Sequence, residues 1–170
     1  ASECHRSMAK FILKILKSPH ILDSYKDTIL GIRSKEKYYD AIIFILISQI
    51  AGFPVDMDDL VNAFDATQLN SPSFKNNPMI KEFLDFDGST VRPMSSIVAN
   101  VLLSKIFKAG VVTDVMINIF KQLNNLRSQK AVRQILRKMM IFSNLQQLLN
   151  KDDKDYKYNL IRFYEALKPL

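Results

Sequence analysis

Apolar residues recur at helical spacing along most of this 170-residue chain. Around Ile15 and again around Tyr25 they fall three and four positions apart, with polar residues between them, as in helices that bury one face. Ser18-Pro19 separates the two stretches and is typical of a helix start, because serine caps the first turn and proline suits its first position. Residues 1–34 are therefore predicted to form a helical hairpin. The second helix is expected to bury Ile21, Leu22, Tyr25, Ile29 and Leu30.

The most apolar segment runs from Tyr38 to Ala51 and has few polar positions. Its isoleucines would suit a strand, but a length of about 14 residues without a turn residue favours a helix buried on nearly every face. Gly52 is expected to end this helix, and residues 53–55 to be short and extended. The run is also shorter than the roughly 20 residues that cross a bilayer, so no membrane partner is expected.

One short segment interrupts the helical pattern. Residues 84–92 contain Asp87-Gly88 between two short runs of alternating apolar and polar residues. This pair favours a tight hairpin turn, whose two central positions need positive φ. With these two residues in the turn, Phe86 is expected opposite Ser89, and the segment forms a two-stranded β-hairpin.

Helix-start signals lie on both sides of the hairpin. Ser71-Pro72 and Asn77-Pro78 each place a capping residue before a proline, which predicts a helix that is kinked or broken between them. Asp56 is expected to cap a helix that begins after it and precedes these two starts. Ser95-Ser96 is expected to cap the helix that follows the hairpin. The order helix, strand, helix, helix, hairpin, helix predicts a winged-helix domain over residues 35–108.

Beyond Gly110 the hydrophobic spacing is helical to the end of the chain. It predicts helices over Val111–Leu126, Ser128–Asn150 and Tyr156–Leu167. Successive helices of this size suggest an α-solenoid-like array over residues 109–170, although no clean repeat is visible. The predicted fold is mainly α, with a winged helix that contains one β-hairpin, flanked by an N-terminal helical hairpin and C-terminal α-solenoid-like helices.

Composition favours a reducing, cytoplasmic location. Cys4 is the only cysteine, so no disulfide can form within the chain, and no Asn-x-Ser/Thr glycosylation acceptor occurs. The N-terminus begins abruptly at Ala1 without a secretory signal, which suggests a cut inside a longer protein.

The sequence contains little that would support catalysis or metal binding. Its four glycines stand too far apart to form a phosphate-binding loop. Cys4, His5 and His20 do not match the spacing of a zinc site, and the aspartates around Asp58 lack the glycine and terminal glutamate of a calcium loop. No enzyme activity, metal site or cofactor is therefore predicted for this segment.

The net charge is +7, and the excess lies in the C-terminal half rather than on the hairpin. A basic stripe on one face of the helix predicted over 128–150 could follow a nucleic-acid backbone; the alternative is an ordinary solvated surface. The stripe consists of Arg127, Lys130, Arg133 and Arg137. The winged helix itself weakens the DNA-reading hypothesis, because its third helix offers only Lys75 and Lys81.

Three stretches carry a family resemblance: EFLDFDGSTVRPMSSIVANVLL at 82–103, MMIFSNLQQLL at 139–149 and YNLIRFYEALKPL at 158–170. The first, together with residues 54–60, resembles the regulatory winged helix that follows the ATPase core in STAND-type signalling NTPases, particularly bacterial ones. The other two resemble the helical region downstream of it. The likeness covers residues 35–170, and residues 1–34 would be the end of the preceding helical lid.

The resemblance implies a non-catalytic regulatory and interaction segment, which couples nucleotide state to conformational change and assembly, as in switches used in bacterial antiviral defence. In related NB-ARC-type ATPases a Met-His-Asp motif at the start of the helix after the wing senses the β-phosphate of ADP. Here Met94-Ser95-Ser96 stands at that place, so hydroxyl residues replace the histidine and aspartate. Arg92, Ser95 or Ser96 would then contact the nucleotide, because a helix N-terminus favours anions. Alternatively, the two serines only cap their own helix.

The resemblance also implies partners. The chain's own ATPase core would bind ATP or ADP, and a protein partner or a second copy would assemble with it. The alternative function is a winged-helix nucleic-acid-binding protein that uses the basic stripe. A structural scaffold without any nucleotide connection is the third possibility.

Overall fold

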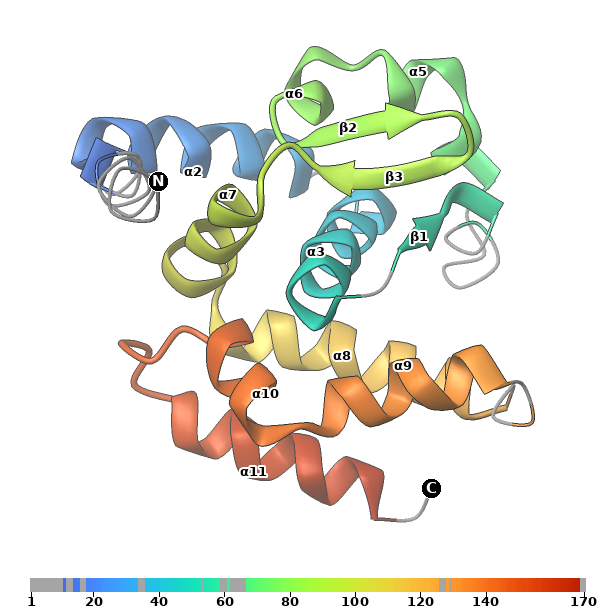
Figure 1. Ribbon diagram of the computed structural model, residues 1–170. Helices are drawn as coiled ribbons and strands as arrows, with labels where there is room; N and C mark the ends of the chain where they lie inside the picture. The colour runs from blue at the N-terminus through green and yellow to red at the C-terminus, as the bar shows by residue number, and fades with distance from the viewer. Residues whose placement is uncertain are drawn as a thin grey trace, which may run out of the picture.

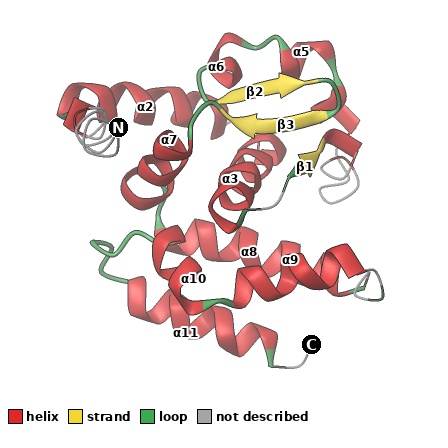
Figure 2. Cartoon of the chain, in the orientation of Figure 1, coloured by secondary structure: helices red, strands yellow, loops and turns green. Residues whose placement is uncertain are grey.

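The computed structural model describes residues 11, 14–15, 18–33, 36–52, 54–58, 61, 67–125, 128 and 130–168. Over these residues the chain is mainly helical, with a small three-stranded antiparallel sheet (Figure 1). Figure 2 shows the sheet on one side of the molecule and the C-terminal helices on the other. Most of the first predicted helix lies outside the described residues.

Two helices follow the few described residues of the first predicted helix. Helix α2 spans Pro19–Arg33 and α3 spans Glu36–Ala51, so the predicted start after Ser18 and the choice of helix for the isoleucine-rich segment are confirmed. Gly52 follows α3 with a φ of 69°, a left-handed conformation that glycine adopts without strain.

Helix α2 buries a narrower face than its apolar pattern predicted. Ile29 is 5% exposed, whereas Leu30 is 58% exposed, so the prediction of Leu30 as a core residue is wrong. Helix α2 packs against α3 and the turn over Leu102–Ile106, and neighbouring positions on a helix point about 100° apart. A helix covered on one side therefore leaves one of the two residues in solvent.

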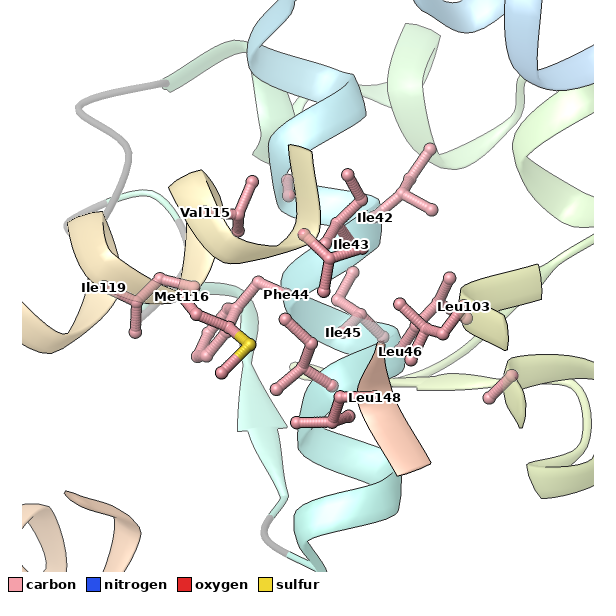
Figure 3. Packing of buried hydrophobic residues seen from close by; sticks show 14 of the residues in the cluster. Ile42, Ile43, Phe44, Ile45, Leu46, Leu103, Val115, Met116, Ile119 and Leu148 are labelled. Atoms are coloured by element: carbon pink, nitrogen blue, oxygen red, sulfur yellow. The ribbon is translucent and has the colours of Figure 1, made fainter. Parts of the chain in front are cut away.

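Helix α3 forms the centre of the core. Its side chains from Ala41 to Ile47 are at most 6% exposed, because the sheet, α2, α7 and the C-terminal helices all pack around it. Figure 3 shows the neighbours that surround it: Leu103, Val115, Met116, Ile119 and Leu148. Burial of each such side chain stabilises the fold by roughly 1.5–3 kcal/mol.

The hairpin is confirmed, but its predicted register is wrong. Strands β2 and β3 span Leu84–Asp87 and Thr90–Pro93. Phe86 pairs with Val91, so Gly88 and Ser89 occupy the turn and Gly88 takes its first central position with a φ of 61°. This register places two apolar side chains opposite each other on the inner face. The predicted one would have placed a serine opposite Phe86.

A third strand completes the sheet. Strand β1 spans Val55–Asp56 and pairs antiparallel with β3, which gives the strand order β1-β3-β2. The sequence predicted an extended segment here but not its pairing. Between β1 and β2, a 3₁₀ helix η1 spans Thr67–Asn70, and α5 and α6 are single turns over Pro72–Lys75 and Pro78–Lys81. The predicted break between the two prolines is thus confirmed.

The chain turns sharply after the hairpin. Helix α7 spans Ser96–Val101 and continues as a π-helical turn, η2, over Leu102–Ile106. Helix α8 then covers Ala109–Asn124 and lies at 117° to the α7–η2 segment. Among the described residues, no single helix has both the length and the apolar composition needed to cross a membrane, and α7–η2 with α8 meets both criteria only as this bent pair.

The prediction of a single helix over Ser128–Asn150 is wrong. It is divided into α9, Lys130–Met140, and α10, Phe142–Leu148. Ile141 breaks it with a φ of −67° and a ψ of 118°, and the Asn144 side chain donates to the Lys138 carbonyl at 2.9 Å. The break turns α10 towards α3, where Leu148 is fully buried.

The last helix, α11, spans Tyr156–Leu167 and packs along α8. Phe163 of α11 meets Phe120 of α8 with ring centroids 6.3 Å apart. One buried cluster includes residues from α2 to α11, so the residues predicted as a winged helix and those predicted as a helical array share a core. The boundary between residues 108 and 109 stays a prediction.

Candidate functional site

The first candidate site lies where β3 passes into α7. Arg92 is the cross-strand partner of Asp85, and its Nε and Nη2 donate to one carboxylate oxygen at 3.1 and 2.9 Å. Both side chains are largely exposed, where such a pair stabilises the fold by about 0–1 kcal/mol. Arg92 therefore already has a carboxylate partner. Among the described residues, only its Nη1 group has no hydrogen-bond acceptor.

The two serines differ in what they do. The Ser95 hydroxyl accepts hydrogen bonds from the backbone N–H groups of Ile97 and Val98 at 3.1 and 3.5 Å, so it is the N-cap of α7. Ser96 is the exposed first residue of the helix. Capping, one of the two predicted roles, is confirmed for Ser95, while nucleotide contact stays a prediction for all three residues.

The hairpin is held at both of its ends. At its base, the Met94 N–H donates to the Phe83 carbonyl at 2.8 Å, and at its tip the Met57 N–H donates to the Ser89 carbonyl, also at 2.8 Å. Hydrogen bonds from the Ser89 side chain and the Asp58 N–H lower the pKa of the Asp56 carboxyl. The first bond closes the base of the hairpin, and the second joins its turn to the residue after β1.

A hollow of about 450 Å³ lies beside β2. Strand residues Leu84 to Phe86 and the exposed Met94 line one side of it, and Lys75, Asn76 and Lys81 line the other. The Lys81 ammonium donates to the Asn76 side chain at 3.1 Å. The positive charges that the sequence placed on the third helix therefore lie over β2, on two separate helical turns.

The basic stripe is the second candidate site. Lys130, Arg133 and Arg137 are exposed on α9, whereas Arg127 lies outside the described residues. Arg133 donates to the Ser128 carbonyl at 2.5 Å, which holds it along its own helix. Lys138, a neighbour not assigned to the stripe, donates to the Gly52 carbonyl at 2.6 Å and so joins α9 to the C-terminal end of α3, where a positive charge is favourable.

Of the three residues considered as metal ligands in the sequence, the structure describes only His20. Cys4 and His5 lie outside the described set, and His20 lies on α2 beside Asp23 and Asp27 at a shallow surface hollow. Among the described residues, no group of three histidine, cysteine or acidic side chains is arranged to hold a metal ion.

Sequence reasoning missed the role of the loop over 151–155. Asp153 accepts from the N–H of Ala109, the first residue of α8, at 3.0 Å, and Asp152 forms an ion pair with Lys105 of η2. Hydrogen bonds from the N–H groups of Asp155 and Ala109 lower the pKa of the Asp153 carboxyl. The partners are more than 40 residues apart, so no local sequence signal could have revealed these contacts.

Comparison with known proteins does not assign the chain to a family. No protein-family model matches it, and no curated protein or solved structure does so either.

Proposed function

We propose that this chain is a non-catalytic regulatory and interaction segment of a STAND-like NTPase. It couples the nucleotide state of an ATPase core to conformational change and assembly in the cytoplasm, with antiviral defence as the biological setting. The observation that carries the proposal is the position of α3, which packs against β3 on one side and against α8 and α10 on the other. A displacement of the hairpin would therefore reach the C-terminal helices through a single packed helix.

Two features support a winged-helix assignment for residues 35–108. The element order is α3, β1, short helices, β2, β3 and α7. The hairpin is joined through β3 to the strand that precedes the short helices. The inner face of the hairpin covers α3, with Leu84 and Val91 at most 2% exposed, as expected for a wing that belongs to the core.

The proposed mechanism is a rigid-body movement of this segment relative to the ATPase core. Nucleotide would bias the movement by contacts made in only one of the two arrangements. Arg92 and Ser96 suit that role better than Ser95, because the Ser95 hydroxyl already accepts two backbone hydrogen bonds. The sharp α7–α8 corner and its π-helical turn lie next in the chain, and π-helical turns are frequent at functional positions.

Sedimentation velocity of the complete protein encoded by the open reading frame tests this proposal. The sedimentation coefficient is expected to differ between ADP and a non-hydrolysable ATP analogue, and Arg92→Ala with Ser96→Ala is expected to reduce that difference. Arg162→Ala is the matched control, since Arg162 also forms an ion pair with an exposed aspartate but lies on α11. Identical sedimentation with both nucleotides would contradict the proposal.

Nucleic-acid binding is the second candidate function, favoured by one observation. Helix α9 contains no acidic residue and exposes Lys130, Arg133 and Arg137. Fluorescence anisotropy with a random duplex at rising salt tests it, because phosphate contacts weaken steeply with salt. Binding that is abolished by Lys130→Glu with Arg137→Glu, and kept by Lys121→Glu with Lys157→Glu, would support this function. Absence of binding at low salt would exclude it.

A further inference from the structure

Positive charges outnumber negative charges on the last three helices. Helix α9 contains four cations and no acidic residue, α10 has no charged residue, and α11 contains two cations and one glutamate. Arg162 of α11 forms an ion pair with Asp114. On α9, by contrast, the exposed Lys130 and Arg137 have no ion-pair partner in the described part of the chain. This side of the molecule therefore carries uncompensated positive charge.

Exposed apolar side chains lie beside these cations. Met140, the last residue of α9, is 45% exposed, and Ile141 at the break before α10 is 48% exposed. The Tyr164 hydroxyl donates to the Met140 carbonyl at 3.4 Å, so α11 passes close to the break, as Figure 1 also shows. Ile161 is 58% exposed and lies three residues before Tyr164, which makes the two neighbours on the surface of α11. Exposed apolar residues are therefore gathered where α11 passes the break between α9 and α10.

One side of α9 carries both kinds of residue. Arg133, Arg137 and Met140 are spaced by four and three residues and are exposed, so they follow one another along the outer side of the helix. Leu136 and Met139 face the core and are buried. The apolar side of α9 is thus already covered, and its outer side is a row of cations that ends in an exposed apolar residue. Together with Lys130, Ile141 and Ile161, these three exposed residues form the basic–apolar face.

The composition of the basic–apolar face favours a partner that is both acidic and apolar. Nucleic acid would neutralise the cations, but it would leave Met140, Ile141 and Ile161 without apolar contacts. A bilayer would require a helix that inserts its apolar side, and the apolar side of α9 is turned to the core. A protein segment with carboxylates and apolar side chains complements both parts of the face.

A second copy of the chain does not supply such a segment. Two copies of the basic–apolar face would repel each other, because both are positively charged. Among the described helices, α3 alone has a net negative charge, and its side chains from Ala41 to Ile47 are buried. It therefore cannot offer an apolar stripe to a neighbouring copy.

We propose that the basic–apolar face binds an acidic amphipathic helix of another protein. Carboxylates one turn apart on that helix would pair with the cations of α9. Apolar residues on its next turn would cover Met140, Ile141 and Ile161, as in other cases where an amphipathic helix is recognised by its apolar side. The inference rests on the interaction role in the proposed function and adds the chemistry of the partner.

Fluorescence anisotropy of a labelled designed peptide, titrated with the chain in the absence of nucleotide, tests the proposal. The peptide has about 18 residues, or five helical turns, with leucines along one side and glutamates beside them. Three control peptides have the same length: one has the same composition in scrambled order, one has glutamine in place of glutamate, and one has serine in place of leucine. The acidic amphipathic peptide is expected to bind at least about tenfold more tightly than each control, because it alone matches both the charges and the apolar residues.

Two double variants of the chain locate the binding. Lys130→Glu with Arg137→Glu reverses two exposed charges and is expected to weaken binding of the acidic amphipathic peptide by at least about tenfold. Met140→Ser with Ile161→Ser removes exposed apolar surface and is expected to weaken that binding by about tenfold. All four residues are exposed, so far-UV circular dichroism should show that both variants keep the fold.

Matched control variants make the same changes on other elements. Lys75→Glu with Lys81→Glu alters the net charge equally, on the short helices beside the sheet. Leu30→Ser with Met94→Ser removes two apolar side chains that are 58% and 59% exposed. Neither control should change the affinity for the peptide.

Equal affinity for all four peptides, or no loss of affinity in either double variant of the basic–apolar face, would overturn the proposal. It would also be overturned if the peptide did not bind while a random duplex or phosphatidylserine vesicles did so through the same residues. Self-association of the chain that both double variants abolish would identify a second copy as the partner and overturn it as well. Because nucleotide is absent throughout, a negative result here is distinct from an unchanged sedimentation coefficient in the test of the proposed function.

Discussion

At the scale of single residues, the turn of the hairpin depends on one glycine. Gly88 has a φ of 61° and nothing within 4 Å of the position of a Cβ. A side chain there would therefore be strained by backbone conformation and not by crowding. Gly88→Ala is expected to lower the free energy of unfolding by about 1–2 kcal/mol, the cost of a left-handed L-residue.

Gly110→Ala is the matched control for that prediction. Gly110 lies in the first turn of α8, and a Cβ would meet only the Asn159 side chain at ordinary contact distance. Its replacement is expected to be neutral or slightly stabilising, because alanine is the better helix former. Urea unfolding followed by far-UV circular dichroism measures both variants, and equal effects of the two would contradict the argument.

The two serines at the start of α7 give a second residue-scale prediction. Ser95→Ala removes the hydroxyl that accepts from two backbone N–H groups, so the free energy of unfolding should fall by about 1 kcal/mol. Ser96→Ala removes an exposed hydroxyl that does not cap the helix, and it should have almost no effect. If Ser96→Ala lowered the free energy of unfolding as much as Ser95→Ala does, the assignment of Ser95 as the cap would be contradicted.

At the scale of elements, the 151–155 loop stabilises the start of α8 at long range. Asp153→Ala removes the acceptor for the Ala109 N–H and is expected to cost about 1 kcal/mol at neutral pH. Asp155→Ala is the control, because its side chain makes no cap hydrogen bond. Hydrogen exchange of the α8 first-turn amides should become faster in the first variant only.

The same contact predicts a pH dependence. The pKa of Asp153 is lowered in the folded protein by the two N–H groups it accepts from, so its stabilising effect is present above the unfolded-state pKa and is lost as pH falls through the lower folded value. The stability difference between the wild type and Asp153→Ala should therefore be constant near neutrality and decrease below about pH 4. Urea unfolding at several pH values measures it, and a difference that grows on acidification would reverse the assignment.

Local signals predicted where most elements begin and end, since these depend on neighbouring residues. The proline-marked starts of α5 and α6 and the glycine after α3 are examples. The hairpin register was mispredicted because Asp87-Gly88 and Gly88-Ser89 are both acceptable turns. The observed register places Val91 in the core beside α3 and lets Phe86 contact Phe74 of α5, with ring centroids 6.0 Å apart. These tertiary contacts decide between the two turns, and the residues around the turn do not indicate them.

At the scale of the whole molecule, packing against α3 determines features of the fold that local sequence signals do not predict. Leu148 and Leu145 are fully buried, and a continuous helix over 128–150 would not turn α10 towards α3. The exposed position of Leu30 has the same kind of cause, since only one side of α2 is covered. For the candidate sites, the sequence indicated that a serine caps α7, and Ser95 does so. It could not reveal that Arg92 bonds to Asp85, which depends on the hairpin register, or that Asp153 accepts from the Ala109 N–H, which depends on tertiary contacts.

The shared core leads to a prediction about cooperativity. If residues 35–108 and 109–170 folded as separate domains, they would unfold in separate steps. Since α3 is covered by the sheet and by α8 and α10 at once, the chain is expected to unfold in one transition, with circular dichroism and tyrosine fluorescence giving coincident curves. The sequence contains no tryptophan, so its six tyrosines report tertiary structure.

Leu148→Ala tests that coupling directly. Removal of this fully buried side chain from α10 should lower the free energy of unfolding by about 2–5 kcal/mol. Because the cavity would lie against α3, hydrogen exchange should become faster in α3 and in β3 as well as in α10. Ile161→Ala is the control, as Ile161 is 58% exposed on α11 and should have little effect. Faster exchange confined to the C-terminal helices would mean that the hairpin is not coupled to them, and the proposed transmission through α3 would then fail.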